Sequence, residues 1–350
     1  MAVIRATAQD IAKLAGVSQT TVSLVLNDVP NARISKDVRR RVREVAKSLD
    51  YHPNASAQSL RRRKTRTIGL VIPDSKNPHF WQITEGVERK AAERGYNVLL
   101  GSTDLGFDRE RLILQSLKQQ QIDGLIVQVQ FPSKSLREIQ AYGHSVVRIG
   151  AFSVELDGVV PDYSVGCTML MEHLVGLGHR RIGFVFGTTA PGLPQPEVGL
   201  GQDRLLAYWR AVTEHHLVRD AELVQCCGPR PDDAREATRR LLALEHRPSA
   251  IISINDYLAF PVIKTIMEAG LRVPKDISVA GFDDVSLAQY LSPALTTVRA
   301  NAEMLGEKAV ELLLRRLENQ GMPPQHLTVP ASLVVRESTE VYTAVAAWEA

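Results

Sequence analysis

The sequence predicts an α/β fold: a small, all-α helix-turn-helix headpiece followed by a core of two doubly wound parallel sheets. Short helical patterns separated by a glycine occupy the first 53 residues, and apolar runs alternate with helical stretches from Thr67 onward. Residues 1–66 hold 14 Lys and Arg against 5 Asp and Glu, whereas residues 67–350 hold 28 against 34, which gives net charges of +9 and −6. A basic domain on an acidic body is typical of a polyanion-binding module attached to another domain.

The first helix is predicted to begin after Thr7, a favourable N-cap, and to end at Gly16. Its apolar residues Ile11, Leu14 and Ala15 follow helical spacing, so we expect them to face inward.

A second short helix is predicted to follow at once, with Ser18 as its cap. The side chains expected to face inward are Val22, Val25 and Leu26. Those expected to face outward are Gln19, Thr20, Ser23 and Leu24. Two short helices joined by a glycine-containing turn form a helix-turn-helix, whose second helix fits the major groove of DNA.

A third helix is predicted after Ser35, with one apolar stripe and a strongly basic opposite face. Such a face is often merely solvated, but beside a helix-turn-helix it is suited to contact phosphates. The residues that follow predict a six-residue helix from Ala55 to Leu60 and then a basic linker. A helix this short is unstable by itself, so we expect it to form only when it is held in place, as a switch.

The core is predicted from eight apolar runs that alternate with helical stretches, which indicates two lobes with parallel sheets. Gly95, Gly178 and Gly270 each follow a helical stretch and precede a strand, where a left-handed C-cap is expected. Ligands of such folds bind beyond the carboxyl ends of the strands. The polar and aromatic residues at these ends are Asp74–Gln82, Gln128, Arg148, the loop Gly187–Arg204, Asn255–Tyr257 and Phe282–Asp284.

These strand-end residues suit a small polyhydroxylated or planar ligand, because they combine stacking surfaces with hydrogen-bonding groups. Two of them also have simpler interpretations: Asp283 as a helix cap and Phe80 as a core residue. His79 has no serine or cysteine nucleophile in a recognisable arrangement with it, so we interpret it as a residue that lines a binding site.

Several classes of protein are not expected. There is no signal peptide and no run of ~18 apolar residues, so we expect a cytoplasmic protein without a membrane partner. Cys167, Cys226 and Cys227 match neither a disulfide framework nor a zinc site and are expected to be buried on a helix and a strand. Glycine-rich nucleotide-binding, nucleophile-elbow and metalloprotease motifs are absent, so we expect no enzymatic activity, no cofactor and no metal.

The chain resembles the lactose-repressor family of bacterial transcription regulators over about residues 7–338. The resemblance is carried by "DIAKLAGVSQTTVSLVLN", "YHPNASAQSL", "IGLVIPDSKNPHF", "DGLIV", "HLVGLGHRRIGFVFG", "SAIISINDYLAF", "GLRVPKDISVAGFDD" and "PALTTVRANAEMLGEKAVELLL". It implies a headpiece at residues 1–53, a hinge helix and linker at 54–66, a periplasmic-binding-protein-like core at 67–340 and a tail at 341–350. Lobe one would comprise about 67–161 and 292–325, and lobe two about 162–291 and 326–340.

The resemblance also assigns residues that contact DNA. The base-reading positions are Gln19, Thr20 and Leu24; glutamine can pair with adenine and leucine can contact a thymine methyl. The positions in the turn or against the DNA backbone are Thr7, Ser18, Ser23, Asn27 and Arg33. The positions that would enter the minor groove from the hinge are Asn54, Ala57 and Leu60, the last as a wedge that kinks the operator.

For the effector the resemblance implies a site between the lobes, formed by His79, Phe80, Gln128, Arg204, Asn255 and Asp283. Arg204 and Asp283 would clamp neighbouring hydroxyls while Phe80 supplies an apolar wall. The expected protein is a repressor that binds a pseudo-palindromic operator as a homodimer and responds to a sugar or sugar derivative. The alternative is a corepressor-type regulator that responds to a nucleobase or other metabolite. A two-lobed small-molecule-binding or transport protein is disfavoured by the headpiece and by the lack of a signal peptide. The tail has no leucine heptads that would assemble tetramers.

Overall fold

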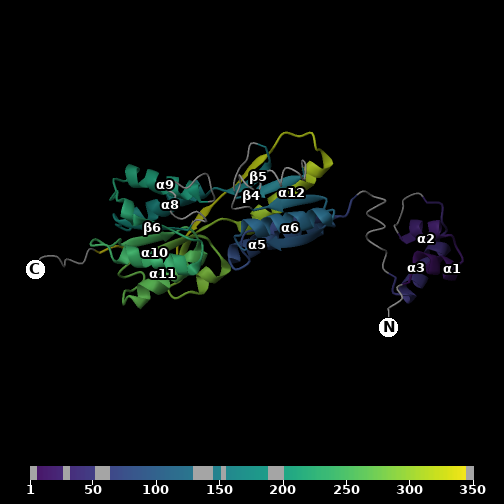
Figure 1. The fold of residues 1–350 in the computed structure, drawn as a ribbon, viewed down its shortest axis with the longest axis horizontal. Helices are drawn as coiled ribbons and strands as arrows, with labels where there is room; N and C mark the ends of the chain where they lie inside the picture. Colours follow the sequence, from purple (N-terminus) through teal and green to yellow (C-terminus); the bar gives the residue numbers. More distant parts are fainter. Residues whose placement is uncertain are drawn as a thin grey trace, which may run out of the picture. The chain divides into compact units, whose positions relative to one another are not determined.

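The computed structural model describes residues 6–26, 32–51, 64–128, 145–150, 155–187 and 201–343 of the chain. These residues belong to two compact units, Met1–Thr65 and Arg66–Ala350 (Figure 1). Each unit has a hydrophobic core of its own.

The N-terminal unit consists of three helices: α1 (Ala8–Ala15), α2 (Gln19–Leu26) and α3 (Lys36–Ser48). Thr7 caps α1 in a capping box with Asp10, and Gly16 ends it in the left-handed conformation at φ 64°. Only glycine adopts this conformation without strain, which explains why the chain turns here. The predicted helix-turn-helix is therefore present.

One prediction about the buried face of α1 is wrong. Leu14 is 62% exposed, and Ala12 takes the expected inward place beside Ile11 and Ala15. With about 100° of rotation per residue, Leu14 lies roughly 100° from the centre of the face that these three residues form. The buried core of this unit also includes Val22 and Val25 of α2, as predicted.

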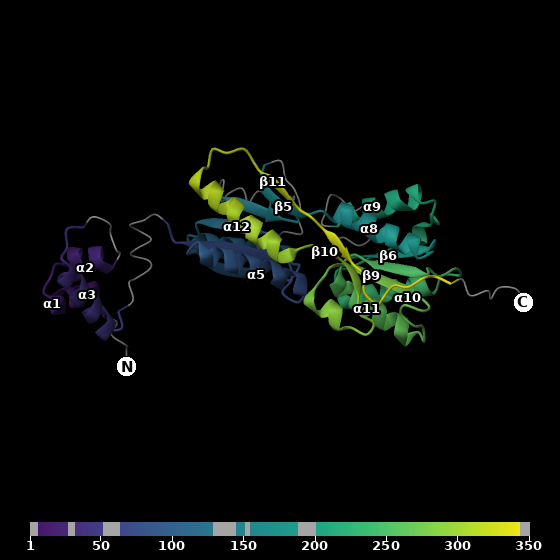
Figure 2. The ribbon, with the colours of Figure 1, turned by 180° about the vertical axis from the view of Figure 1, so that it is seen from behind.

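The first lobe of the core is built on a six-stranded parallel sheet with the order β11-β5-β4-β3-β1-β2. Its strands are β1 (Thr67–Ile72), β2 (Asn97–Ser102), β3 (Gly124–Val127), β4 (Val146–Ile149), β5 (Asp157–Pro161) and β11 (His326–Val329). Two helices, α5 (Pro78–Glu93) and α12 (Ala302–Glu318), cover one face and lie side by side (Figure 2). The other face packs against α6 (Phe107–Gln119).

The second lobe repeats this architecture with the order β12-β10-β9-β8-β6-β7. Its strands are β6 (Ile182–Gly187), β7 (Val224–Cys227), β8 (Ala250–Ser253), β9 (Ser278–Asp283), β10 (Thr296–Arg299) and β12 (Ser332–Val334), and β12 is antiparallel to β10. One face of the sheet is covered by α8 (Tyr163–Gly176) and α9 (Gln202–Glu214), the other by α10 (Pro231–Leu242) and α11 (Asp256–Glu268) (Figure 1). Two short 3₁₀ helices, η1 (Ala221–Leu223) and η2 (Ser286–Tyr290), complete the lobe.

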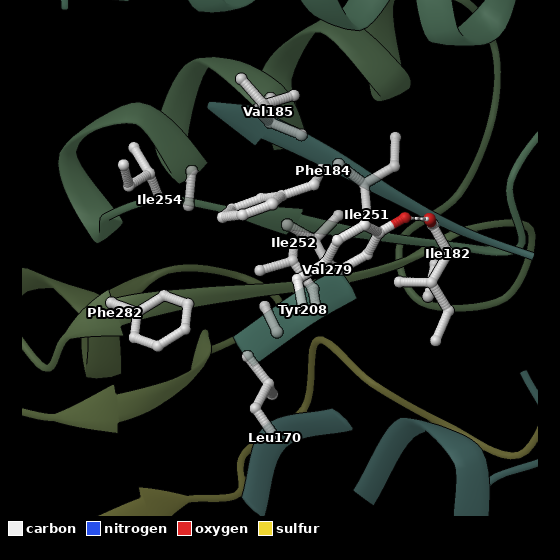
Figure 3. Packing of buried hydrophobic residues seen from close by; sticks show 14 of the residues in the cluster. Leu170, Ile182, Phe184, Val185, Tyr208, Ile251, Ile252, Ile254, Val279 and Phe282 are labelled. Atoms are coloured by element: carbon white, nitrogen blue, oxygen red, sulfur yellow. Dashed lines mark hydrogen bonds between the residues drawn. The ribbon is translucent and has the colours of Figure 1, made fainter. Parts of the chain in front are cut away.

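Aromatic side chains fill the centre of the second lobe (Figure 3). Phe184, Phe282 and Tyr208 are each almost completely buried. The Tyr208 hydroxyl donates a 2.8 Å hydrogen bond to the Ile182 carbonyl, so this buried polar group is satisfied (Figure 3).

The chain passes between the lobes after β5, after β10 and after β11. The predicted lobe boundaries misplace two strands: β10 belongs to the second sheet and β11 to the first. The sequence could not place these crossings, because a four-residue strand fits either sheet equally well until its neighbours are known.

Local predictions for the core have mixed outcomes. Gly95, Gly178 and Gly270 have positive φ, as predicted for residues that end helices. Cys167 and Cys227 are buried, but Cys226 is exposed on the edge strand β7, contrary to expectation. No helix within the described ranges is both long and apolar enough to cross a bilayer.

Candidate functional site

The residues predicted to contact DNA surround the turn between α1 and α2. Ser18 caps α2 by accepting a 3.1 Å hydrogen bond from the Thr21 N–H. Gln19 and Thr20 at the start of α2 are exposed, whereas Ser23 and Leu24 are half-buried one turn later. Arg33 is exposed before α3. The start of α2 thus presents an amide and a hydroxyl to solvent, the groups that read base edges.

A basic face on α3 adds charge to this unit. A shallow depression along the helix is lined by Lys36, Arg39, Arg40, Arg43, Glu44 and Lys47. Five of these six side chains are cations, which suits contact with phosphates. The predicted contacts Asn27, Asn54, Ala57 and Leu60 lie outside the described residues.

In the core, six residues from the two lobes converge where the strands end and the helices begin, and we call them the inter-lobe cluster. Its members are His79, Phe80, Tyr163, Arg204, Phe282 and Asp283. His79 and Phe80 come from the first turn of α5, and the other four from the second lobe. Four of the six were predicted effector residues, Phe282 was named only among the strand-end candidates, and Tyr163 was not predicted.

Asp283 is the centre of the cluster. Its carboxylate, 4% exposed, accepts a 2.5 Å hydrogen bond from the Tyr163 hydroxyl and lies 3.6 Å from Nδ1 of His79. Its backbone has φ 106°, a conformation that is strained for a residue with a side chain. It caps no helix, because the 3₁₀ helix that follows has Val285 at its N-cap and no side-chain cap.

The segment around Asp283 is held by hydrogen bonds of two acidic side chains, Asp256 and Asp284. Asp256 accepts hydrogen bonds from the Val285 N–H at 3.0 Å and the Thr297 hydroxyl at 2.6 Å. Burial, with a smaller contribution from Asp283, raises the pKa of Asp256 well above its usual value. The neighbouring Asp284 is bound by Arg299 and Arg336 at 2.7 and 2.6 Å. Such anchoring maintains the strained backbone that positions the Asp283 carboxylate.

Arg204 is held on the other side of Tyr163. Its guanidinium carbon lies 4.1 Å from the centroid of the Tyr163 ring and 5.5 Å from that of Phe282. One terminal nitrogen donates to the Ile254 carbonyl at 2.8 Å. The ring and the carbonyl therefore fix the orientation of a cation that is 8% exposed.

His79 is buried within this charged surrounding. Burial lowers its pKa below the usual value and nearby Arg204 lowers it further, while the Asp283 carboxylate opposes both effects. We infer that the imidazole is neutral, so it can offer either a donor or an acceptor to a ligand.

The remaining predicted effector residues lie around the cluster with different surroundings. Phe80 belongs to the buried core of the first lobe and meets His79 edge-on, so the simpler interpretation of it as a core residue is supported. Gln128 directly follows β3 and is buried. The Asn255 side-chain oxygen caps α11 by accepting from the Leu258 N–H at 2.8 Å. Residues 188–200 of the long loop lie outside the described ranges.

Buried polar atoms without hydrogen-bond partners lie near the carboxyl ends of both sheets. Within the described residues, five buried side-chain atoms have no hydrogen-bond partner: His79 Nδ1, Gln82 Oε1, Gln128 Oε1, Arg148 Nε and Arg204 Nε. All five residues lie near the carboxyl end of a strand or the start of a helix. Buried polar atoms in native proteins are nearly always paired, so a concentration of unpaired ones indicates a place where a ligand or water binds.

Other polar contacts join the lobes beside the cluster. Arg230 of the second lobe contacts the Asp104 carboxylate at 3.1 Å, and Gln82 donates to the Asp284 carbonyl at 3.4 Å. Sequence reasoning did not assign Arg230 or Asp104 to the site and named Gln82 only within the strand-end stretch Asp74–Gln82, because these contacts depend on how the lobes pack rather than on a local pattern.

Both units of the chain are similar to known proteins. Residues 7–54 match the family of bacterial regulatory proteins, lacI family, and residues 171–339 match a periplasmic binding protein-like domain. The HTH-type transcriptional repressor PurR of Escherichia coli O139:H28 is 34% identical over 340 residues, which cover 95% of this chain and 96% of that protein. The PurR repressor of Aliivibrio salmonicida is 31% identical over 337 residues, covering 95% and 98%.

Solved structures give the same result for the fold. The Lac repressor dimer bound to operator and the anti-inducer ONPF superposes with a TM-score of 0.84 at 26% identity, covering 96% of this chain and 99% of that one. The complex of the transcriptional regulator CelR with cellobiose has a TM-score of 0.70 at 26% identity, covering 95% and 100%.

Proposed function

Because the chain belongs to the lacI family of bacterial regulatory proteins and is a DNA-binding transcriptional repressor, we propose that a small effector bound at the inter-lobe cluster controls its affinity for an operator. The observation that carries this proposal is the set of unpaired buried donors and acceptors at the carboxyl ends of both sheets. A ligand that satisfies groups from both lobes stabilises one arrangement of the lobes over others.

The effector that we favour is a nucleobase or a similarly compact, planar heterocycle. Such a ligand has ring N–H and carbonyl groups to pair with His79, Gln128 and Arg204, and a flat face to pack on aromatic side chains. The full-length similarity to repressors named PurR supports this class. A nucleobase is therefore favoured over the sugar that the sequence alone predicts. A sugar is the second candidate, because the similar CelR was solved with cellobiose.

The repressor is proposed to bind a pseudo-palindromic operator as a homodimer. The similar Lac repressor, solved as a dimer bound to operator, supports this proposal. Each headpiece would place α2 in the major groove, with Gln19 and Thr20 against base edges and Leu24 against a thymine methyl. The basic face of α3 and Arg33 would contact phosphates, and these contacts would make binding strongly dependent on salt.

The hinge is proposed to transmit the effector signal. The short helix at Ala55–Leu60 would form only between the two subunits on DNA, where Leu60 wedges into the minor groove. An effector that changes the arrangement of the first lobes would change the spacing of the two hinge helices, and hence the affinity for the operator, by as much as its affinity differs between the two states.

The test measures operator affinity by fluorescence anisotropy, using DNA from upstream of the repressor's own gene, with and without each candidate ligand. The panel contains adenine, guanine, hypoxanthine and uracil, and for the second candidate ribose, glucose and cellobiose. We expect a nucleobase to change the Kd of the operator complex by about tenfold or more. A response to a sugar alone would reject the nucleobase proposal and retain the site.

Asp283→Ala and Arg204→Ala test the position of the site. Both variants are expected to lose the effector response while they still bind operator, because these residues lie far along the chain from the helix-turn-helix. A folded variant that responds normally to the effector would show that the site has been misplaced.

Leu60→Ala tests the hinge. Only the kinked complex uses the wedge, so the affinity for operator is expected to fall by at least about tenfold more than the affinity for unrelated DNA of equal length. Equal losses on the two DNAs would contradict the hinge proposal.

A further inference from the structure

We propose that Tyr163 determines the specificity of the effector site, because it occupies the space between Asp283 and Arg204 and excludes ligands that need both charges side by side. This inference rests on the proposed function above, in which the effector binds at the inter-lobe cluster.

The hydroxyl of Tyr163 donates a hydrogen bond to the carboxylate of Asp283. The 2.5 Å hydrogen bond uses Oδ1, the same oxygen that faces His79 at 3.6 Å. Burial raises the pKa of Tyr163 well above its usual value, and Asp283 raises it further. The hydroxyl therefore stays protonated and donates, so one acceptor position of this oxygen is already used when a ligand arrives.

The ring of Tyr163 separates that carboxylate from the guanidinium of Arg204. The guanidinium lies over the ring face at 4.1 Å, and the Phe282 ring packs against it in a T-shaped arrangement, with 5.8 Å between the ring centroids. Within the described part of the chain, Arg204 and Asp283 make no direct ion pair within 4.0 Å; the acidic partner of Arg204 is Asp203, at 3.8 Å. Tyr163 is thus held by Asp283 at its hydroxyl and by Arg204 and Phe282 at its ring.

The position of Tyr163 in the fold makes this arrangement rigid. It is the first residue of α8, directly after the chain crosses from β5 into the second lobe, and Asp162 caps the helix. Only 7% of its surface is exposed. A side chain held in this way cannot swing aside without disturbing the start of the helix.

The consequence concerns the chemistry of the ligand. A carboxylate and a guanidinium that lie close together can bind two neighbouring hydroxyls of a sugar, one accepting and the other donating. With Tyr163 between them, this paired mode is blocked, while Nε of Arg204, Nδ1 of His79 and the Gln128 oxygen have no hydrogen-bond partner. These dispersed groups suit a flat ligand that contacts each of them with a different edge.

The experiment compares the Kd of ribose with the Kd of guanine by isothermal titration calorimetry. The variants are Tyr163→Asn, which removes the ring, and Tyr163→Phe, which keeps it. Tyr208→Phe is the matched control, because it removes the hydroxyl of another buried tyrosine of this lobe, whose bond goes to Ile182 (Figure 3). We expect Tyr163→Asn to lower the ratio of the ribose Kd to the guanine Kd by at least about tenfold, and the control to leave it unchanged.

Tyr163→Phe keeps ribose excluded, because the ring still separates the charges. It frees an oxygen of Asp283, so the guanine Kd should change by at least about threefold relative to Tyr208→Phe. This variant decides the question if Tyr163→Asn does not fold. A folded Tyr163→Asn with an unchanged ratio, or a Tyr163→Phe identical to the control, would overturn the inference.

The same measurements distinguish a wrong effector class from a wrong role for Tyr163. If the wild type prefers ribose to guanine, the nucleobase effector is rejected, and the ratio in Tyr163→Asn still decides the role of Tyr163. If the wild type binds neither probe, Tyr163→Asn must acquire ribose binding, and a variant that binds neither would also overturn the inference.

Discussion

At the scale of single residues, His179 shows how a buried imidazole makes stability depend on pH. It is 2% exposed, and its two ring nitrogens lie 2.9 and 3.1 Å from the hydroxyls of Ser249 and Ser278. Burial lowers its pKa to about 4, so the folded protein keeps the imidazole neutral where the unfolded chain already binds a proton.

The sign of the effect follows from proton linkage. Because the pKa is lower in the folded state, this contribution to stability is fully present above pH ~6.5 and is lost as pH falls toward 4. Between pH 7.5 and pH 5 we expect the free energy of unfolding, measured with urea, to fall by about 2 kcal/mol because of His179. In His179→Gln the fall in the free energy of unfolding between pH 7.5 and pH 5 should be smaller by this amount. The control is His246→Gln, which replaces an exposed histidine of the same lobe and should leave the fall unchanged. An undiminished difference in His179→Gln would contradict this account.

At the scale of elements, α5 and α12 approach so closely that glycine is required on both helices. A Cβ on Gly86 would lie 2.0 Å from the Glu303 carbonyl oxygen, and one on Gly306 would lie 2.3 Å from the Ile83 carbonyl oxygen. Arg89 reinforces the contact by binding Glu303 at 2.9 Å. Since α5 carries His79 and α12 follows a crossing between the lobes, this packing connects the site to the crossing.

Alanine at these glycines tests the contact. We expect Gly86→Ala and Gly306→Ala each to reduce the free energy of unfolding by about 2–3 kcal/mol or more, because a methyl group meets backbone that cannot give way. Gly176→Ala is the control. Gly176 lies in α8, and a Cβ added there would meet no neighbouring atom within 4 Å, so alanine should be neutral or stabilise the protein by up to about 1 kcal/mol. Urea midpoints that do not separate Gly86→Ala and Gly306→Ala from Gly176→Ala would show that the helices can move apart.

At the scale of the whole molecule, apolar side chains exposed on the core are consistent with the proposed dimer. In the first lobe β2 is an edge strand, with Leu99 and Leu100 37% and 40% exposed, and Leu112 on α6 is 61% exposed. In the second lobe an apolar groove along α11 is lined chiefly by Phe260, Ile263, Met267 and Leu291. An open strand edge with leucines beside it favours association with a partner.

A pair of lysine substitutions tests this surface. Leu112→Lys should weaken the dimer by at least about tenfold and weaken operator binding with it, because a charge would be buried in the interface. Leu206→Lys is the control, since Leu206 is equally exposed, at 62%, but lies on α9 of the other lobe. Sedimentation velocity over a range of protein concentrations measures the dimer dissociation constant of both variants. Equal behaviour of the two variants would place the interface elsewhere.

The sequence alone determined what depends on neighbours along the chain. The capped helices, the turn at Gly16, the glycines that end helices and the alternation of strands with helices follow from local periodicity and backbone preference. The strand-end rule also brought His79, Arg204 and Asp283 together as candidates, because parallel strands place their carboxyl ends at one edge.

Only the tertiary structure decided what depends on distant contacts. Which sheet β10 and β11 join and the place of Tyr163 between Asp283 and Arg204 are set by packing between segments far apart in sequence. A strand of four residues or a single tyrosine has the same local preferences in either setting. The free energy that selects one setting comes from burial and hydrogen bonding between the lobes, and no short stretch of sequence contains it.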